Sequence, residues 1–154
     1  MATSTAVRST QKNSEPHLQF AALPYRLDNG LEVMLVSSLD SGRWIIPKGW
    51  PMDGLTGYET AAREAFEEAG LIGNIAAKSI GQFHYQKRRK NGAVWLCRVE
   101  VFPMEVTQQR KKWPEKHDRT TKWFTVEQAA ELVREEELAE VMRQFAATQR
   151  VPQG

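Results

Sequence analysis

Residues 49–71 read GWPMDGLTGYETAAREAFEEAGL, the most distinctively patterned stretch of the chain. Two prolines and two glycines fall within residues 47–54, so no regular element can continue through them and a loop is expected. A helix is expected to begin at Gly57 and to run through Ala69, because Gly70 stands where a helix commonly ends in a left-handed residue. The stretch therefore predicts a loop that leads directly into a helix.

The predicted helix has two chemically distinct faces. With Glu64 set at 0° and about 100° per residue, Glu67 falls near ~300° and Glu68 near ~40°, so the three carboxylates share one face. The apolar residues fall between about 100° and 200° and form the stripe that would pack on a sheet; they are Ala62, Ala65, Phe66 and Ala69. We therefore expect the acids to point away from the core.

The acidic face favours a bound cation over the alternative, a solvated amphipathic helix. A solvated face would interleave Lys or Arg, whereas clustered like charges cost about a few tenths of a kcal/mol per pair. Glu67 and Glu68 also lie near the C-terminal end of the helix dipole, where negative charge is unfavourable. Arg63 is placed to hold Glu67 through an i,i+4 pair. Three hard oxygen ligands on one face suit Mg²⁺ or Mn²⁺.

These residues resemble the Nudix box. The family pattern is a glycine, five residues, a glutamate, seven residues, then Arg-Glu-aliphatic-x-Glu-Glu-x-Gly-aliphatic, and Gly49 with residues 63–71 matches it. The sequence departs from the pattern at Leu55, where the family has the isolated glutamate, and more mildly at Ala65, where a bulkier aliphatic residue is usual. Asp53, in the loop, is the nearest acid that could approach the place of the missing glutamate.

The resemblance implies the Nudix fold, an α+β structure in which a central mixed β-sheet lies between helices as an α/β/α sandwich with a catalytic loop-helix. Paired strands are expected at residues 20–25 and 31–36, joined at Asn29-Gly30, and the first should be an edge strand because it contains Pro24. Further strands are expected at residues 44–46, 78–86, 93–106 and 122–124, and further helices at 126–133 and 135–147.

The length of 154 residues is typical of one domain. We predict a disordered N-terminal segment over residues 1–16 and the Nudix domain over residues 17–150. Residues 1–14 are rich in Ser, Thr and Ala, with Arg8 and Lys12 and no acid, which weakly resembles an organelle transit peptide. A frayed terminus is the favoured interpretation, because the segment is short.

Three further stretches resemble the diphosphoinositol polyphosphate phosphohydrolase branch of the family: residues 32–38, 42–47 and 123–129. Pro47-Lys48-Gly49 is also similar to diadenosine polyphosphate hydrolases, whereas Lys122 departs from the acid usual in the inositol branch. The resemblance implies a metal-dependent hydrolase that cleaves a pyrophosphate bond in a nucleoside-diphosphate-linked or diphosphoinositol-type substrate. The alternative is a non-catalytic Nudix domain that binds nucleotide or inositol phosphate as a sensor.

The resemblance also assigns roles to residues. Glu64 and Glu68 are expected as the principal ligands of Mg²⁺ or Mn²⁺, Glu67 as ligand or general base, and Arg63 as a further catalytic residue, while the Gly49 backbone comes close to the metal. The identity of the base stays open. Candidates for gripping a polyanionic substrate are Arg26, Arg43, Lys48, Arg119 and the cationic residues 87–90, and Trp50 is the candidate for stacking.

Composition excludes several other classes of protein. A formal net charge of +2 falls short of a dedicated nucleic-acid binder, so we expect a small polyphosphorylated substrate and no nucleic acid as partner. The single cysteine, Cys97, excludes a disulfide framework within one chain and favours a cytoplasmic location. No apolar run approaches the ~18–20 residues that span a membrane, so no membrane partner is expected. A homodimer is compatible with the sequence and is not decided by it.

Overall fold

The computed structural model of the protein describes residues 15–149, which build one eight-stranded sheet and the helices around it. The strands are β1 (His17–Arg26), β2 (Glu32–Ser37), β3 (Trp44–Ile45), β4 (Lys48–Gly49), β5 (Leu71–Ile75), β6 (Gly81–Arg88), β7 (Val94–Gln109) and β8 (Thr121–Thr125). The helices are α2 (Gly57–Ala69), α3 (Val126–Leu132) and α4 (Glu136–Gln149). Apart from Glu15 and Pro16, the segment predicted to be disordered lies outside the described residues.

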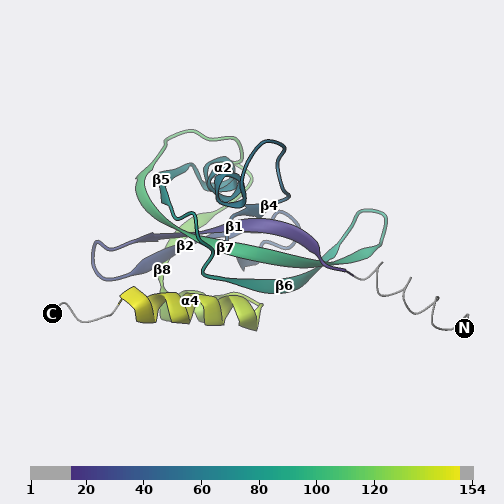
Figure 1. Cartoon of the computed structure of the whole chain (residues 1–154). Helices are drawn as coiled ribbons and strands as arrows, with labels where there is room; N and C mark the ends of the chain where they lie inside the picture. Colours follow the sequence, from purple (N-terminus) through teal and green to yellow (C-terminus); the bar gives the residue numbers. More distant parts are fainter. Residues whose placement is uncertain (1–14, 150–154) are drawn as a thin grey trace, which may run out of the picture.

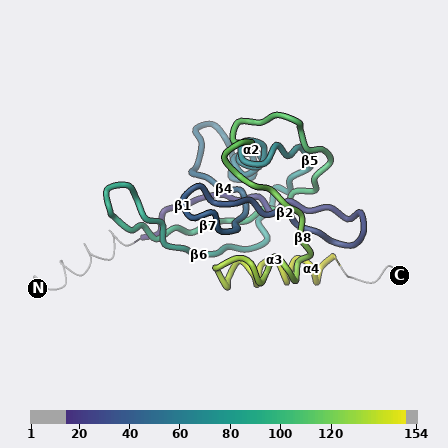
Figure 2. The backbone as a smooth tube through the Cα atoms, turned by 180° about the vertical axis from the view of Figure 1, so that it is seen from behind, coloured from purple at the N-terminus to yellow at the C-terminus, as the bar shows by residue number. Residues whose placement is uncertain are grey.

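Helices cover both faces of the sheet. Figure 1 shows α2 on one face and α4 on the other, and Figure 2 shows α3 beside α4. Two separate apolar clusters result: one contains Ala61, Ala65 and Ala69 of α2, and the other contains Leu138, Met142 and Phe145 of α4. The expected α/β/α sandwich with a mixed sheet is confirmed, because β1 pairs in parallel with β7 while its other partners are antiparallel.

The first strand, β1, lies in the middle of the sheet, and the prediction that Pro24 places it at an edge is wrong. The main path of the sheet runs β3-β2-β1-β7-β5, with β4 also paired to β1. The amide of Ala22 donates to Pro47 O at 3.0 Å, and the nitrogen of Pro24, two residues on, faces the same side. On that side β1 pairs with β4 before Pro24 and with β2 after it. Pro24 therefore falls where the ladder needs no donor.

Strand β7 carries two partners in succession along one edge. Its N-terminal half pairs with β6 and its C-terminal half with β5, while β1 runs along the other edge. The sequence predicted strands at the places of β6 and β7 but not β5, a short strand with only its first residue fully buried. It also did not predict β4, which lies within the stretch expected to be only loop, because its two residues are held by pairing with β1 and not by a local pattern. The predicted short strand around Trp123 is present as β8, which pairs with β2.

Helix α2 has the predicted bounds, and its ends explain them. A reciprocal capping box links Thr56 and Glu59 at the start, and Gly70 ends the helix at φ 70°. The indole of Trp113 lies directly against Gly70, where any Cβ would collide with the ring. Glycine is therefore required at this position twice over, by backbone conformation and by the neighbouring ring.

The polar insert, residues 110–120, covers the C-terminal end of α2. Its backbone amides at Arg110 and Glu115 donate to Gly70 O at 2.8 Å and to Glu67 O at 3.0 Å. The indole N–H of Trp113 donates to Glu68 O at 3.2 Å. These bonds satisfy carbonyls that a helix leaves without partners at its C-terminus. The insert is thus fixed to the acidic helix.

We predict that Gly70→Ala destabilises the protein more than Gly54→Ala. Both glycines have positive φ, but a Cβ at Gly54 meets nothing within 4 Å. Gly54→Ala should therefore cost only the backbone strain, about 1–2 kcal/mol, whereas Gly70→Ala should cost about 1–3 kcal/mol more because Trp113 must move. Urea unfolding monitored by tryptophan fluorescence measures both. Equal losses would show that the packing of Trp113 contributes nothing.

Candidate active site in the cleft beside α2

A cleft of about 890 Å³ runs between α2, the insert, the β6–β7 hairpin and the residues just before α4. Most of the site residues expected from the sequence line it: Arg43, Lys48, Gly49, Trp50, Glu64, Glu68 and Arg119. Lys87 and Arg88 of the expected hairpin cations line it as well. Five expected residues do not line it: Arg26, Arg63, Glu67, Arg89 and Lys90. The structure therefore brings together the glycine, two carboxylates and most of the cations.

Glu68 is buried, and the prediction that it points away from the core is wrong. Its exposed fraction is 3%, and Ala61, Ala65 and Ala69 of the same helix are fully buried. On the helical wheel Ala61 falls at about 60°, beside Glu68 at about 40°, so the buried arc of α2 includes the carboxylate. The expected stripe instead included Ala62 and Phe66, which are only partly buried.

The carboxylate of Glu68 reaches the cleft from within this interface. One oxygen accepts a bond of 3.4 Å from the backbone amide of Lys48. The other, Oε1, has no hydrogen-bond partner, although it is buried, and lies 3.8 Å from a guanidinium nitrogen of Arg119. A buried carboxylate oxygen without a hydrogen bond is costly unless a cation approaches it. The free lone pairs of Oε1 are the feature that most directly suits a metal ion.

Glu64 lies beside Glu68 and over the backbone of Gly49. A Cβ at Gly49 would collide with the Glu64 carboxylate, so only glycine lets the strand come this close. Strand β4, with Lys48 and Gly49, is paired to β1, which holds the backbone beneath both glutamates. The glycine that the Nudix pattern requires therefore makes room for a carboxylate in this chain.

Burial shifts the pKa values of Glu64, Glu68 and Lys48 in the direction that favours the neutral form of each group. Burial raises the pKa of Glu68 to about 8, although Arg119 and Lys48 act in the opposite direction. Burial also raises the pKa of Glu64, an effect partly opposed by the neighbouring Glu68 carboxyl group. The pKa of Lys48 is lowered to about 8, again chiefly by burial. Two desolvated carboxyl groups side by side would both gain from a divalent cation.

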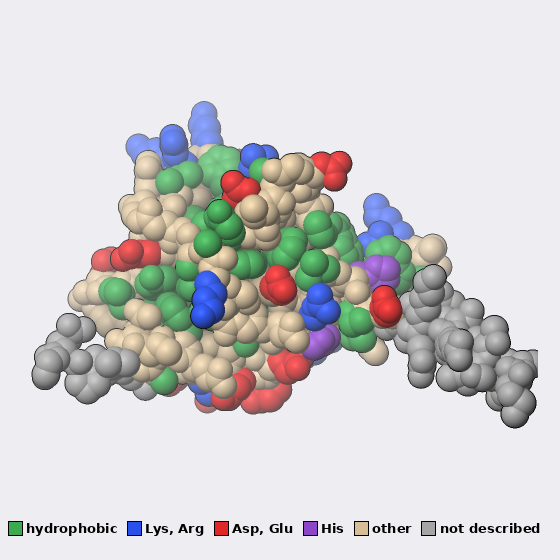
Figure 3. Space-filling view, viewed as in Figure 1, with side chains coloured by type: hydrophobic (Ala, Val, Ile, Leu, Met, Phe, Trp, Pro, Cys, Tyr) green, Lys and Arg blue, Asp and Glu red, His purple; other side chains and the backbone are tan. Residues whose placement is uncertain are grey.

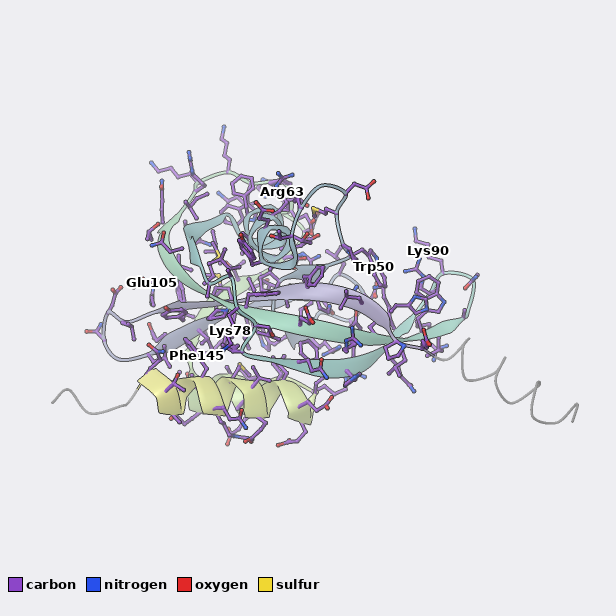
Figure 4. All side chains as sticks on the ribbon, viewed as in Figure 1. Trp50, Arg63, Lys78, Lys90, Glu105 and Phe145 are labelled. Carbon is purple, nitrogen blue, oxygen red and sulfur yellow. The ribbon has the colours of Figure 1, made fainter. Side chains whose placement is uncertain are left out.

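Glu64 and Glu68 fit a divalent metal, but the expected set of three converging carboxylates is not found. Within residues 15–149, no group of three His, Cys, Asp or Glu side chains is placed to hold an ion. Glu67 is partly buried outside the cleft, and Arg63 is exposed and forms no ion pair with it. Figure 4 shows Arg63 on the side of α2 remote from the sheet. Mg²⁺ needs only one or two protein carboxylates when waters and phosphates complete its shell.

Several cations of the site are paired with protein carboxylates. Arg43 donates two bonds to Glu135, at 3.2 and 2.8 Å, and closes the wall of the cleft near α4. Arg26 pairs with Glu32 at 2.8 Å and lies over the ring of Trp123, away from the cleft. Arg26 therefore lies outside the cleft, so its contact with substrate stays an untested prediction, and Arg43 has a structural partner. Asp53, considered as a substitute for the missing glutamate, is exposed and does not line the cleft.

An aromatic and cationic cluster stands where the hairpin meets the cleft. The rings of Trp50 and Trp95 meet edge to face with centroids 5.8 Å apart, and Arg89 lies 4.2 Å from the Trp95 centroid. His17 stacks on Trp95 at 3.8 Å. Trp95 is partly buried at this hairpin. Figure 4 shows Trp50 next to the hairpin that carries Lys90, and Figure 3 shows Lys and Arg side chains at this end.

Sequence reasoning missed several residues of the cleft. Gln19 and Tyr85 line it and are joined by a bond of 2.7 Å. Gln19 is a polar residue within the otherwise apolar residues 18–24, which is a weak signal in the sequence, and Tyr85 gives no such signal. Glu115 and Glu135 line the walls. Nothing in the sequence separates these two acids from their many charged neighbours, because only the insert and the start of α4 bring them inward.

Residues 16–147 match the family model described as the NUDIX domain. The chain belongs to the Nudix domain family. It is 33% identical to Nudix hydrolase 12, mitochondrial, of Arabidopsis thaliana over an alignment of 120 residues, which covers 76% of this chain and 59% of that protein. It is 33% identical to diphosphoinositol polyphosphate phosphohydrolase 3-beta of Bos taurus, covering 73% of this chain and 66% of that protein. This Nudix chain thus spans between about half and two thirds of these relatives.

Solved structures share the fold at low identity. A binary complex of C. elegans Ap4A hydrolase has a TM-score of 0.64 at 20% identity, covering 86% of this chain and 97% of that one. The NUDIX domain of Shewanella oneidensis NrtR, complexed with ADP ribose, has a TM-score of 0.63 at 16% identity, covering 88% and 91%. None of the helices within residues 15–149 is long and apolar enough to cross a membrane. The domain bounds, the cytoplasmic location and the homodimer stay predictions.

We predict that Glu68→Gln leaves the metal-free protein at least as stable as the wild type. The substitution keeps an acceptor for the Lys48 amide and removes a charge that burial disfavours. Glu68→Ala is the control, and should melt lower because it leaves a cavity. Melting in EDTA and then in Mg²⁺ measures both effects. Mg²⁺ should raise the melting temperature of the wild type but not of either variant. An equal rise in Glu68→Gln would show that Glu68 is not a metal ligand.

Proposed function

We propose that the cleft hydrolyses a pyrophosphate bond in a small polyphosphorylated substrate, with Mg²⁺ or Mn²⁺ held by Glu64 and Glu68. The observation that carries the proposal is the buried Glu68 carboxylate, whose Oε1 has no hydrogen-bond partner and lies beside Glu64 above Gly49. Membership of the Nudix domain family supports the reaction type.

The residues of the chain would divide the work as follows. A bound divalent ion supplies charge neutralisation at the phosphate oxygens and orients the attacking water. Glu64 and Glu68 would hold the ion, and the Gly49 backbone would let the phosphates come close. Removal of a proton from water needs a carboxylate within reach. Glu64, partly buried and facing the cleft, meets that need better than Glu67, which lies outside it.

The cleft suits a substrate that carries both a flat apolar group and anionic groups. Lys87, Arg88 and Arg134 line it without forming an ion pair with any described acid. Leu39 and Val94 line it too, and their exposed fractions are 59% and 50%. Together with Trp50, these apolar groups offer a surface to a flat nucleobase, which an inositol ring carrying phosphates does not need. We therefore favour a nucleoside-diphosphate-linked substrate over a diphosphoinositol-type one.

Binding without turnover is the second candidate function. Leu55 stands where the family pattern has a glutamate, and no third carboxylate converges on the centre among the described residues. A sensor domain would bind the same class of ligand in the cleft and leave it intact. The two candidates differ only in whether phosphate or nucleotide products appear.

Hydrolysis should depend strictly on divalent metal. We expect product release from a panel of diadenosine polyphosphates, ADP-ribose, nucleoside triphosphates and diphosphoinositol phosphates in Mg²⁺, with base-bearing compounds turned over fastest. Excess EDTA should abolish it, because Glu64 and Glu68 cannot neutralise a phosphate themselves. Glu68→Gln should lower kcat at least about a hundredfold. Full activity in EDTA would contradict the mechanism, and ligand binding without product would establish the sensor.

Replacing both cleft cations of the hairpin, by Lys87→Gln with Arg88→Gln, should raise KM more than it lowers kcat. Long-range charge mainly assists capture of a polyanion, so the effect should shrink as salt rises. Lys111→Gln with Lys112→Gln removes the same charge from exposed positions of the insert and serves as the control. If KM at low salt is the same in both double variants, the hairpin cations are only solvated.

A further inference from the structure

Arg119 occupies an enclosed place at the end of the insert, beside the buried glutamate of α2. Its side chain is 9% exposed, and that of Glu68 is 4% exposed. Within the insert, the Glu115 amide and the Trp113 indole are bonded to carbonyls of α2, as described above. The backbone that carries Arg119 is therefore anchored to the helix that carries Glu68.

The guanidinium of Arg119 is held on two sides by protein acceptors. Its Nε donates to Glu115 Oε1 at 2.7 Å, and one terminal nitrogen donates to Ser37 O at 3.0 Å. Ser37 ends β2, so a strand and the insert both fix the group. Two of its five N–H donors are thus committed to protein acceptors, which fixes the direction in which Arg119 presents its charge.

Arg119 attracts the Glu68 carboxylate without forming a hydrogen bond to it. The same terminal nitrogen lies 3.8 Å from Glu68 Oε1, too far for a hydrogen bond and close enough for strong attraction at a buried site. Oε1 consequently keeps its lone pairs while a positive charge faces it. An arginine that bonded Oε1 directly would compete with a metal for the same lone pairs.

We propose that Arg119 is a positioning residue that orients the Glu68 carboxylate toward the metal, and that Glu115 acts on Glu68 only through Arg119. This inference rests on the proposed metal site. The insert then has a defined role, because it brings one cation to the buried side of the metal ligand. Partners of this kind typically contribute about 10- to 100-fold to metal affinity.

The experiment measures Mn²⁺ binding to the full chain, without substrate, by the loss of the free-ion EPR signal. The variants are Arg119→Met, Arg119→Lys, Glu115→Gln and the double variant Arg119→Met with Glu115→Gln. Arg110→Met is the matched control, since Arg110 is an exposed arginine of the same insert. Circular dichroism and metal-free melting confirm that each variant folds, and Arg119→Lys provides a milder change if Arg119→Met does not.

We expect Arg119→Met to weaken Mn²⁺ binding at least about tenfold and Arg119→Lys to restore part of it, because lysine keeps the charge but not the fork. Arg110→Met should bind as the wild type. Glu115→Gln should weaken binding in the wild-type background and have no further effect in Arg119→Met. At saturating Mn²⁺, Arg119→Met should lower kcat and leave the substrate KM within about threefold.

Two outcomes would overturn the proposal. Unchanged Mn²⁺ affinity in Arg119→Met, with a large rise in substrate KM, would show that Arg119 binds substrate. Additive losses in the double variant would show that Glu115 meets the metal itself. Because Mn²⁺ binding is read without substrate, absence of turnover would refute the proposed hydrolase activity while leaving the role of Arg119 to be decided by the same titration.

Discussion

A carboxylate buried in a helix–sheet interface is the constraint around which the rest of the site is arranged. Glu68 lies within the buried arc of α2 formed by Ala61, Ala65 and Ala69. Such a group must have hydrogen bonds and compensating charge, or the helix would not pack there. The Lys48 amide supplies the hydrogen bond and Arg119 supplies the compensating charge. Both β4 and the insert therefore contact the same carboxylate. The alanines let the helix approach closely enough for this to happen.

The sheet supplies the rigid floor under that point. Strand β1 pairs along one edge with β7 and along the other with β4 and β2, and Pro24 marks the change from one partner to the next. The irregular stretches of the sequence, the Gly-rich loop and the polar insert, are therefore fastened at both ends to regular structure. A site that needs two carboxylates at fixed separation benefits from such support more than from loops alone.

Local patterns in the sequence predicted the elements well and the orientation of side chains less well. The bounds of α2 follow from Gly70 and its left-handed φ, and the capping box of α3 follows from Thr125 and Gln128. The helical wheel predicts an outer position for Glu68 because Ala62 and Phe66 complete the apolar stripe, and nothing local indicates that Ala61 is the residue that packs. The part played by Glu115 and the paired state of Arg43 depend on contacts between distant segments, which no periodicity encodes.

The stack of His17 on Trp95 joins the start of β1 to the hairpin at the mouth of the cleft. In Figures 1 and 2 the described chain begins at this hairpin end, whereas α4 finishes at the opposite end of the molecule. If the chain were joined to another domain or to a solid support through the end that follows α4, the cleft would stay open to solvent. If the chain were joined to the same domain or support through the end that precedes β1, the attached group would lie beside the mouth of the cleft. There it would obstruct the approach of a polyanionic substrate.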